Sequence, residues 1–181
     1  MAGVARGRRL IAPRGHDVRP TSDRVREAIG NRLLSMGALD GAHVLDLFAG
    51  TGALGIEALS RGAARSTFVE QDRTALECLV KNLATTGLES QATVVRSDAQ
   101  RYVEAGHPSA AASFDVAFID PPYAFDDWHE LLGPLRARVA VCEASRPVDA
   151  PAGWEVGRSD RYGTTVVTLL HHVGHAGHGG S

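Results

Sequence analysis

The residues best suited to chemistry in this sequence are Asp120-Pro121-Pro122-Tyr123, which directly follow the short apolar run FDVAFI. Each proline lacks an N–H donor, fixes φ near −65° and pushes the residue before it toward an extended conformation. We therefore expect Asp120 and Tyr123 to be held in a rigid bend after a buried strand. Such a bend presents a carboxylate, a backbone carbonyl and a flat ring to one ligand.

An exocyclic amine of a nucleobase fits these groups. Its nitrogen is a poor nucleophile because the lone pair is delocalised into the ring. Asp120 and the Pro121 carbonyl can accept hydrogen bonds from the NH₂ group and favour a more tetrahedral nitrogen. Tyr123 supplies a stacking surface, worth about 1–3 kcal/mol per base, for a base that is unstacked or flipped out. We predict an amine clamp whose geometry Pro121 and Pro122 fix.

A glycine loop precedes this bend in the chain. Gly50-Thr51-Gly52-Ala53-Leu54-Gly55 matches G-x-G-x-x-G between a predicted strand and a predicted helix. Glu70 ends the next predicted strand, 20 residues after Gly50. At this spacing a carboxylate meets the ribose hydroxyls of a nucleoside cofactor. Gly50, Gly52 and Glu70 are therefore predicted cofactor contacts.

Asp46 indicates which nucleoside cofactor this is. It lies inside the strand, four residues ahead of Gly50, where a carboxylate would repel the pyrophosphate that nicotinamide-binding loops hold at a helix N-terminus. The same carboxylate can accept a hydrogen bond from the ammonium group of an amino acid. S-adenosyl-L-methionine carries that ammonium, a ribose and an adenine. We predict this cofactor, with Asp98 and Ala99 on the adenine side of its pocket.

The positioning elements follow from hydrophobic periodicity. Helices are predicted within 20–36, 49–62, 72–87 and 124–137. Strands are predicted over 43–48, 66–70, 92–99, 114–120 and 139–144, with 154–160 and 164–170 as a closing antiparallel pair and 8–13 as an N-terminal candidate. This alternation predicts an α/β fold with a mostly parallel sheet and helices on both faces. We expect a basic N-terminal extension over 1–20, one domain over 21–170 and a disordered His/Gly-rich tail over 171–181.

Composition bounds the class of protein. The 181 residues are 44% apolar with a mean hydropathy of −0.10, as in a soluble globular protein. No apolar run approaches the roughly 20 residues that span a bilayer, and the first residues lack the apolar region of a signal peptide. We expect a cytoplasmic protein without a membrane contact. Cys78 and Cys142 are expected to be buried thiols.

Charge is distributed unevenly along the chain. Residues 1–32 contain eight arginines and three acidic residues, whereas the rest contains 11 basic and 18 acidic residues. A basic segment of this kind attracts phosphate backbones without reading sequence. A solvated arm explains the same charge equally well.

The sequence resembles the RsmD family in five segments: RPTSDRVREAIGNRLL, LDLFAGTGALGIEALSRGA, FVEQD, KNL and FIDPPYAF. Members of that family transfer a methyl group from S-adenosylmethionine to the exocyclic N2 of a guanine in 16S ribosomal RNA. The likeness runs from residue 2 to about residue 170 and implies a Rossmann-like S-adenosylmethionine-dependent methyltransferase fold. The sequence departs from the family in its shortened start and in its tail, where His171, His172, His175 and His178 lie. We expect no metal there.

The resemblance also implies partners and further contacts. Thr21 and Arg24 would close over the methionine end of the cofactor or face the RNA. Docking of the basic segment on RNA phosphates would involve Arg6, Arg8, Arg9 and Arg19. The expected substrate is 16S rRNA within a 30S particle or an assembly intermediate, and the expected state is a monomer.

Three alternatives stay open from the sequence. The nearest is a methyltransferase acting on adenine N6 or cytosine N4 of DNA or RNA, because such enzymes use a similar clamp. A nicotinamide-dependent oxidoreductase would bind NAD tightly and ignore S-adenosylhomocysteine. A non-catalytic RNA-binding assembly factor would bind RNA without any dependence on Asp120.

Overall fold

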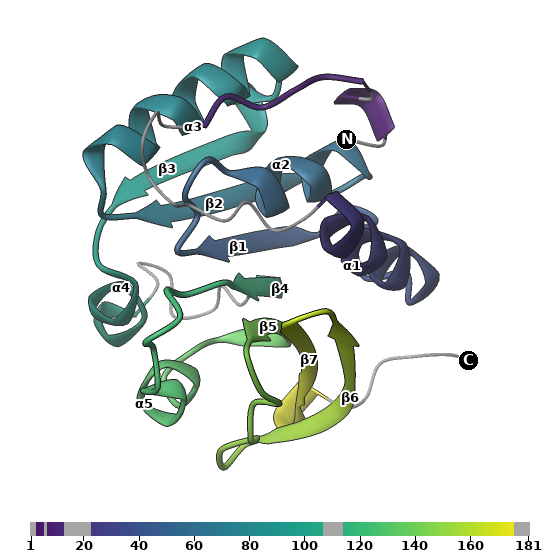
Figure 1. Cartoon of the computed structure of the whole chain (residues 1–181), viewed down its shortest axis with the longest axis vertical. Coiled ribbons are helices and arrows are strands. Elements are labelled where there is room, and N and C mark those ends of the chain that lie inside the picture. The colour runs from purple at the N-terminus through teal and green to yellow at the C-terminus, as the bar shows by residue number, and fades with distance from the viewer. Residues whose placement is uncertain (1–2, 6, 13–22, 107–113, 176–181) are drawn as a thin grey trace.

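A seven-stranded sheet forms the centre of the computed structural model, which describes residues 3–5, 7–12, 23–106 and 114–175 (Figure 1). Its strands are β1 (His43–Leu47), β2 (Arg65–Glu70), β3 (Ala92–Arg96), β4 (Phe114–Ile119), β5 (Ala137–Ala144), β6 (Trp154–Tyr162) and β7 (Thr165–His172). Their order is β3-β2-β1-β4-β5-β7-β6. The first five strands are parallel, and β7 runs antiparallel to β5 and β6. The predicted mostly parallel sheet with an antiparallel C-terminal pair is confirmed.

Helices cover both faces of the sheet. They are α1 (Asp23–Ser35), α2 (Ala53–Ser60), α3 (Arg73–Thr86), α4 (Ala99–Ala105) and α5 (Trp128–Leu132), with short 3₁₀ turns at η1 (Gly3–Ala5), η2 (Glu89–Gln91) and η3 (Val173–His175). The helices α1, α2 and α3 lie on one face, and α4 and α5 lie on the other (Figure 1). Along β1, Val44 packs against the face covered by α1, α2 and α3, while Leu45 and Leu47 pack against the face covered by α4 and α5. The reason is that successive side chains of a strand point to opposite faces of the sheet.

The helix α3 has well-defined ends, as its sequence predicts. The side chain of Asp72 accepts a hydrogen bond from the Ala75 N–H at 2.8 Å and caps the N-terminus. Gly87 ends the helix in a left-handed conformation with φ 71°. These caps fix where α3 begins and ends. The inner side chains of this helix contact the loop after β1.

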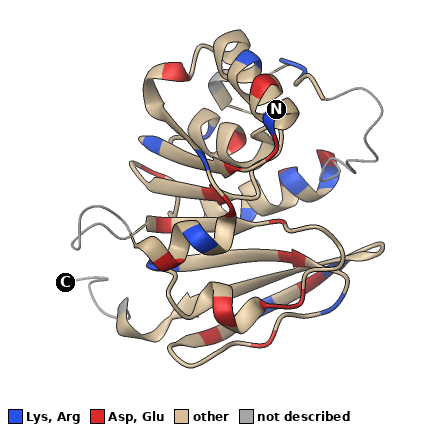
Figure 2. Ribbon diagram, turned by 90° about the vertical axis from the view of Figure 1, so that its left-hand side faces the viewer, with Lys and Arg blue, Asp and Glu red and all other residues tan. Residues whose placement is uncertain are grey.

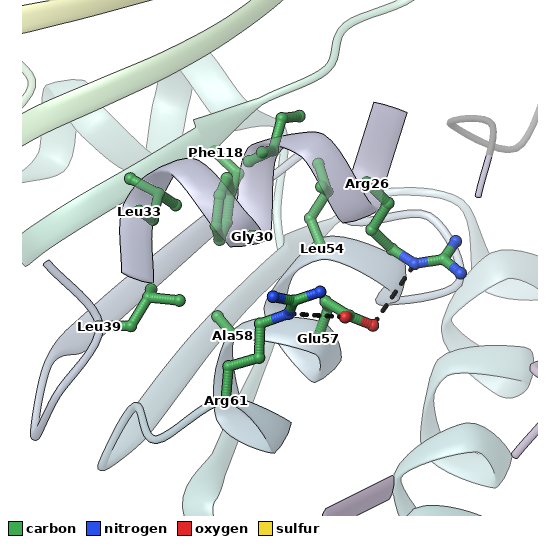
Figure 3. Close-up of a pocket in the computed structure, with 10 residues that line it drawn as sticks. Arg26, Gly30, Leu33, Leu39, Leu54, Glu57, Ala58, Arg61 and Phe118 are labelled. Atoms are coloured by element: carbon green, nitrogen blue, oxygen red, sulfur yellow. Dashed lines mark hydrogen bonds and ion pairs between the residues drawn. The ribbon is translucent and has the colours of Figure 1, made fainter. Parts of the chain in front are cut away.

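A buried group of charged residues joins α1 to α2. The Glu57 carboxylate of α2 accepts a hydrogen bond from Arg61 Nε at 2.7 Å and lies 3.6 Å from Arg26 Nε of α1. Arg61 also donates to Asn31 Oδ1 of α1 at 2.7 Å. Figure 3 shows both guanidinium groups directed toward Glu57 in a small pocket between the two helices. Arg61, at the C-terminal end of α2, thus also contacts α1.

The N-terminal segment packs against α2 and α3 rather than pairing with the sheet. The Ala5 N–H donates to Ser60 Oγ of α2 at 2.8 Å, and Ala5 is buried. The strand predicted over 8–13 is wrong for residues 8–12, which form no strand, and residue 13 lies outside the described residues. The reason is that the backbone of Ile11 pairs with the side chain of Asn82 instead of with another strand.

Other elements also differ from the sequence prediction. The helix α4 was not predicted, and the strand predicted over 92–99 ends at Arg96, because Asp98 caps α4 and Ala99 begins it. The disordered tail expected over 171–181 is wrong for residues 171–175, because β7 extends to His172 and η3 follows it, and residues 176–181 lie outside the described residues. His171 and His172 are paired with Val139 and Trp154 of the neighbouring strands.

The remaining sequence expectations concern charge, membrane and thiols. Basic and acidic positions are interspersed over both helical layers in Figure 2. Within residues 3–5, 7–12, 23–106 and 114–175, no helix has the length and apolar character to cross a membrane. Cys78 and Cys142 are both buried and unpaired with each other, as predicted.

Candidate active site

The predicted cofactor loop lies between the end of β1 and the first turn of α2. Gly50 and Gly52 have positive φ values of 53° and 81°, which strain residues that carry a Cβ. A Cβ on Gly52 would lie 2.2 Å from Leu79 Cδ1, whereas a Cβ on Gly50 would meet only the Phe48 carbonyl, at 3.9 Å. Next along α3, Asn82 Nδ2 donates a hydrogen bond to the Thr51 carbonyl at 3.0 Å. The loop is therefore packed tightly against α3 at Gly52 and loosely surrounded at Gly50.

Asp46 is buried at the base of this loop, with 2% of its surface exposed. Its Oδ2 accepts a hydrogen bond from the Gly55 N–H in the first turn of α2 at 2.9 Å. Burial raises the pKa of Asp46 well above the ordinary value of 3.8, and the charges of Asp120 and Glu70 raise it further, against the lowering effect of the Gly55 bond. A bound cation would stabilise the ionised form, whereas a pyrophosphate would add a further negative charge.

Glu70 stands at the end of β2 beside the loop. Its Oε2 accepts a hydrogen bond from the Gly50 N–H at 2.8 Å, and its Oε1 accepts one from the Asp72 N–H at 2.7 Å. A carboxylate has about four acceptor positions, so each oxygen can accept a further bond from a ribose hydroxyl. The structure thus brings Glu70 and Gly50 into contact, as their spacing predicts for a shared ligand.

Asp98 and Ala99 follow β3, next to β2. The Asp98 Oδ1 accepts a hydrogen bond from the Arg101 N–H at 3.0 Å and caps α4, and Ala99 is buried in the first turn of that helix. The Ser97 N–H bonds to the Glu70 carbonyl at 3.2 Å, which places this loop at the same edge of the sheet. Asp98 therefore has a structural role, and its contact with adenine stays a prediction.

The Asp-Pro-Pro-Tyr bend follows β4 at the same edge. Leu47 of β1 pairs with Ile119 of β4, so Asp120 begins the bend directly beside the residue that follows β1. The Pro122 carbonyl accepts a hydrogen bond from the Phe125 N–H at 2.9 Å, which closes a tight turn. Tyr123 is 68% exposed. The bend thus adjoins the glycine loop, and its aromatic residue is accessible to a ligand.

Phe48 is a site residue that the sequence analysis missed. Its φ of 59° makes it the one non-glycine residue with positive φ in the described part of the chain. Such a conformation costs about 1–2 kcal/mol for a residue with a Cβ. The Phe48 ring packs edge-on against Phe125 at 5.5 Å, and Phe125 packs against Trp128 at 5.2 Å. These aromatic contacts join the glycine loop to the turn after the clamp. No sequence signal distinguishes Phe48 from an ordinary strand-end residue.

The remaining predicted site residues lie on α1, on the N-terminal segment or outside the described chain. Arg24 is exposed in the first turn of α1, and its contact with the cofactor or the RNA stays a prediction. Arg8 and Arg9 are exposed on the N-terminal segment. Three predicted contacts lie outside the described residues: Thr21, Arg6 and Arg19. In the described ranges no group of three or more His, Cys, Asp or Glu residues is arranged to hold a metal ion.

Comparisons with known proteins show which family this chain resembles. A family model described as Conserved hypothetical protein 95 matches residues 1–171. The chain is 42% identical over 164 residues to the ribosomal RNA small subunit methyltransferase D of Haemophilus influenzae, covering 85% of this chain and 83% of that protein. It is 36% identical over 179 residues to YlbH of Bacillus subtilis, named as a candidate rRNA methyltransferase, covering 93% and 96% of the two chains.

A solved structure shows the same fold. The structure of yhhF from Escherichia coli, described as a candidate methyltransferase, superposes with a TM-score of 0.79 at 34% identity, covering 95% of this chain and 96% of that one. The fold is therefore that of the Rossmann-like methyltransferases, as the sequence predicts. The chain belongs to the family of ribosomal RNA small subunit methyltransferase D, the RsmD family.

Proposed function

We propose that this chain transfers a methyl group from S-adenosyl-L-methionine to the exocyclic N2 amine of a guanine in 16S ribosomal RNA. The rRNA substrate is supported by the family relationship, and the guanine N2 target is the reaction of the RsmD family that the sequence resembles. The observation that carries the proposal is the adjacency of β1 and β4. This pairing brings the residues that follow β1 and β4 to one edge of the sheet, which supports an Asp120 clamp beside the glycine loop.

The cofactor assignment is supported by the donors and acceptors at the sheet edge. Asp46 is a buried carboxylate with acceptor capacity for an ammonium group, and Glu70 has capacity for two ribose hydroxyls. Asp46 also bonds the N–H of Gly55 in the first turn of α2, where a nicotinamide enzyme would hold its pyrophosphate. A carboxyl group at this point favours S-adenosylmethionine over NAD, because an ammonium group would stabilise its ionised form and a pyrophosphate would oppose it. When bound, S-adenosylmethionine supplies an electrophilic methyl group on a positively charged sulfur.

The residues of the chain then have distinct tasks. Asp120 and the Pro121 carbonyl accept hydrogen bonds from the guanine amine and turn its lone pair toward the methyl group. Pro121 and Pro122 fix these acceptors in advance, so little reorganisation is needed during the reaction. Tyr123 stacks on the base. Bound S-adenosylmethionine would supply the methyl group to this amine, which would then release a proton to water.

We further propose that the protein acts as a monomer in the cytoplasm on a 30S particle or an assembly intermediate. The chain is one compact α/β unit with no separate domain in its described residues for target recognition. Recognition therefore rests on the shape of folded RNA, which is the usual basis for binding structured RNA.

The test uses tritiated S-adenosylmethionine and purified protein with three substrates: unmodified 30S particles, naked 16S rRNA and DNA. Labelled products are digested to nucleosides and separated. We expect label in N2-methylguanosine from 30S particles or 16S rRNA. Label in methyladenine or methylcytosine would refute the guanine assignment, and no label in any substrate would refute the proposed reaction.

A further inference from the structure

One fully buried side chain contacts both the N-terminal segment and the glycine loop. Asn82 of α3 has 0% of its surface exposed. Its Oδ1 accepts a hydrogen bond from the Ile11 N–H at 2.7 Å, and its Nδ2 donates to the Ile11 carbonyl and the Thr51 carbonyl, each at 3.0 Å. A primary amide has two N–H donors, so both donors of Asn82 are used. One planar group thus fixes the backbone of two segments that are 40 residues apart.

This arrangement makes each contact depend on the other. If the Thr51 carbonyl turned away, a buried N–H of Asn82 would lose its partner. If Ile11 withdrew, the Oδ1 and the second N–H would lose theirs. A buried polar group without a partner is costly, so a fixed glycine loop and a docked N-terminal segment favour the same orientation of the Asn82 amide. Leu79 reinforces this, because its δ-methyl group packs directly under Gly52.

The N-terminal segment carries positively charged side chains, and the orientation of the Asn82 amide fixes where this segment lies. Arg8 donates from Nη1 to the Thr85 carbonyl in the last turn of α3 at 2.6 Å, one turn beyond Asn82. Arg8 and Arg9 are exposed, and Lys81 is exposed on α3 itself. These positive side chains form a surface that suits RNA phosphates. Its geometry depends on the docking of residues 7–12 on α3.

We propose that Asn82 is a positioning residue that couples cofactor binding at the glycine loop to RNA binding at the N-terminal segment. The inference rests on the proposed function and adds a link between its two ligands. A cofactor that fixes the backbone of Gly50-Thr51-Gly52 also fixes the Asn82 amide, and the amide in turn fixes the backbone of Ile11. Coupling between two binding sites is reciprocal, so RNA must tighten cofactor binding by the same factor. We expect a factor of about 2 to 12, which is what one net hydrogen bond supplies.

The first experiment needs no variant. Amide hydrogen exchange at Ile11 is followed by NMR in the intact chain, with and without saturating S-adenosylhomocysteine, whose binding calorimetry verifies separately. We expect the Ile11 amide to exchange about 2- to 12-fold more slowly with the ligand bound. Binding without any slowing at Ile11 would overturn the coupling and leave the proposed function intact. Absence of ligand binding would overturn both, so the two failures are distinguishable.

The second experiment measures the coupling itself. The dissociation constant of S-adenosylhomocysteine is determined with and without unmodified 16S rRNA for the wild type, Asn82→Ala, Asn82→Asp and Ser60→Ala. Ser60→Ala is the matched control, because Ser60 bonds Ala5 of the same segment from the last turn of α2, at the opposite end of that helix from the glycine loop. Asn82→Asp keeps an oxygen for the Ile11 N–H but removes both donors.

The ratio of the two dissociation constants decides the result. We expect the wild type and Ser60→Ala to keep a ratio of about 2 to 12, and both Asn82 variants to fall close to 1. A merely structural role would lower stability and weaken both ligands while leaving the ratio unchanged, and that outcome would overturn the proposal. If the Asn82 variants fail to fold, the exchange measurement on the wild type decides alone.

Discussion

Replacing Glu57 with alanine tests the buried charged group between α1 and α2. The side chains of Glu57 and Arg61 are 5% and 4% exposed, and that of Arg26 is 10% exposed. Removing one partner of a buried ion pair costs about 3–5 kcal/mol, because the remaining charge stays buried without compensation. Glu57→Ala leaves the Arg61 guanidinium without its acidic partner, whereas Arg26 keeps its ion pair with Asp23 at 2.6 Å. We therefore expect the free energy of unfolding to fall by about 3–5 kcal/mol.

Glu77→Ala supplies the matched control on α3. Glu77 pairs with Arg73 at the same i,i+4 spacing, at 3.2 Å, but these side chains are 57% and 80% exposed. An exposed helical pair contributes only about 0.3–0.5 kcal/mol. In a chain of this length 1 kcal/mol shifts Tm by roughly 2–4 °C. We expect Tm to fall by roughly 6–20 °C for Glu57→Ala and by at most about 2 °C for Glu77→Ala.

Urea unfolding followed by circular dichroism measures both variants, and an unchanged m-value verifies that the comparison is one of stability. Glu57→Gln is an intermediate case, because the amide keeps an acceptor for Arg61 but loses the charge. It should fall between the other two. A Glu57→Ala loss within about 1 kcal/mol of the Glu77→Ala loss would refute the reasoning, because it would show that the guanidinium groups find water when their partner is removed.

Three further predictions concern the sheet edge. Asp120→Ala should abolish methyl transfer and leave the affinity for S-adenosylhomocysteine nearly unchanged, whereas Glu70→Ala should weaken that affinity. Calorimetry measures the affinity and the tritium assay measures the transfer. Equal loss of binding in both variants would contradict the division of roles. Burial raises the pKa of Asp46, so this side chain keeps its proton in the folded chain at pH values where the unfolded chain has released it. The stability that this proton contributes is therefore present at low pH and is lost as pH rises through the raised pKa. Asp46→Asn should therefore flatten the fall in the urea midpoint between about pH 4 and that raised pKa, and a parallel slope in both proteins would count against it. Gly52→Ala should lower the free energy of unfolding by about 2–5 kcal/mol, because it combines a φ of 81° with a Cβ only 2.2 Å from a leucine methyl group. Gly50→Ala has the φ penalty alone and should lower it by about 1–2 kcal/mol in the same urea assay.

The sequence was sufficient for the seven strands of the sheet and for most of the residues at its carboxyl edge, Phe48 excepted. Local patterns determine these features: the apolar run before Asp46, the spacing from Gly50 to Glu70, and the prolines after Asp120 act through the residues next to them. Parallel strands then end at one edge of the sheet, so residues that follow different strands meet without any long-range information.

The features that the sequence did not predict depend on contacts between distant segments. Asn82 reads as an ordinary polar residue within a helix, because its partners Ile11 and Thr51 are 71 and 31 residues away. Glu57 is a buried acid only because arginines from two elements surround it. The expected strand at 8–13 failed for the same reason, since β propensity describes a segment and not the partner available to it.

The docked N-terminal segment also affects the order in which the chain can fold during synthesis. Ile11 bonds Asn82, 71 residues later, and Arg8 bonds Thr85, 77 residues later. At about 5–20 residues per second, these partners leave the ribosome roughly 4–15 s after the segment itself. Contacts with such sequence separation also form late because the loop between them must close first. The segment that is made first is thus fixed late, and it is open to proteases until α3 is complete.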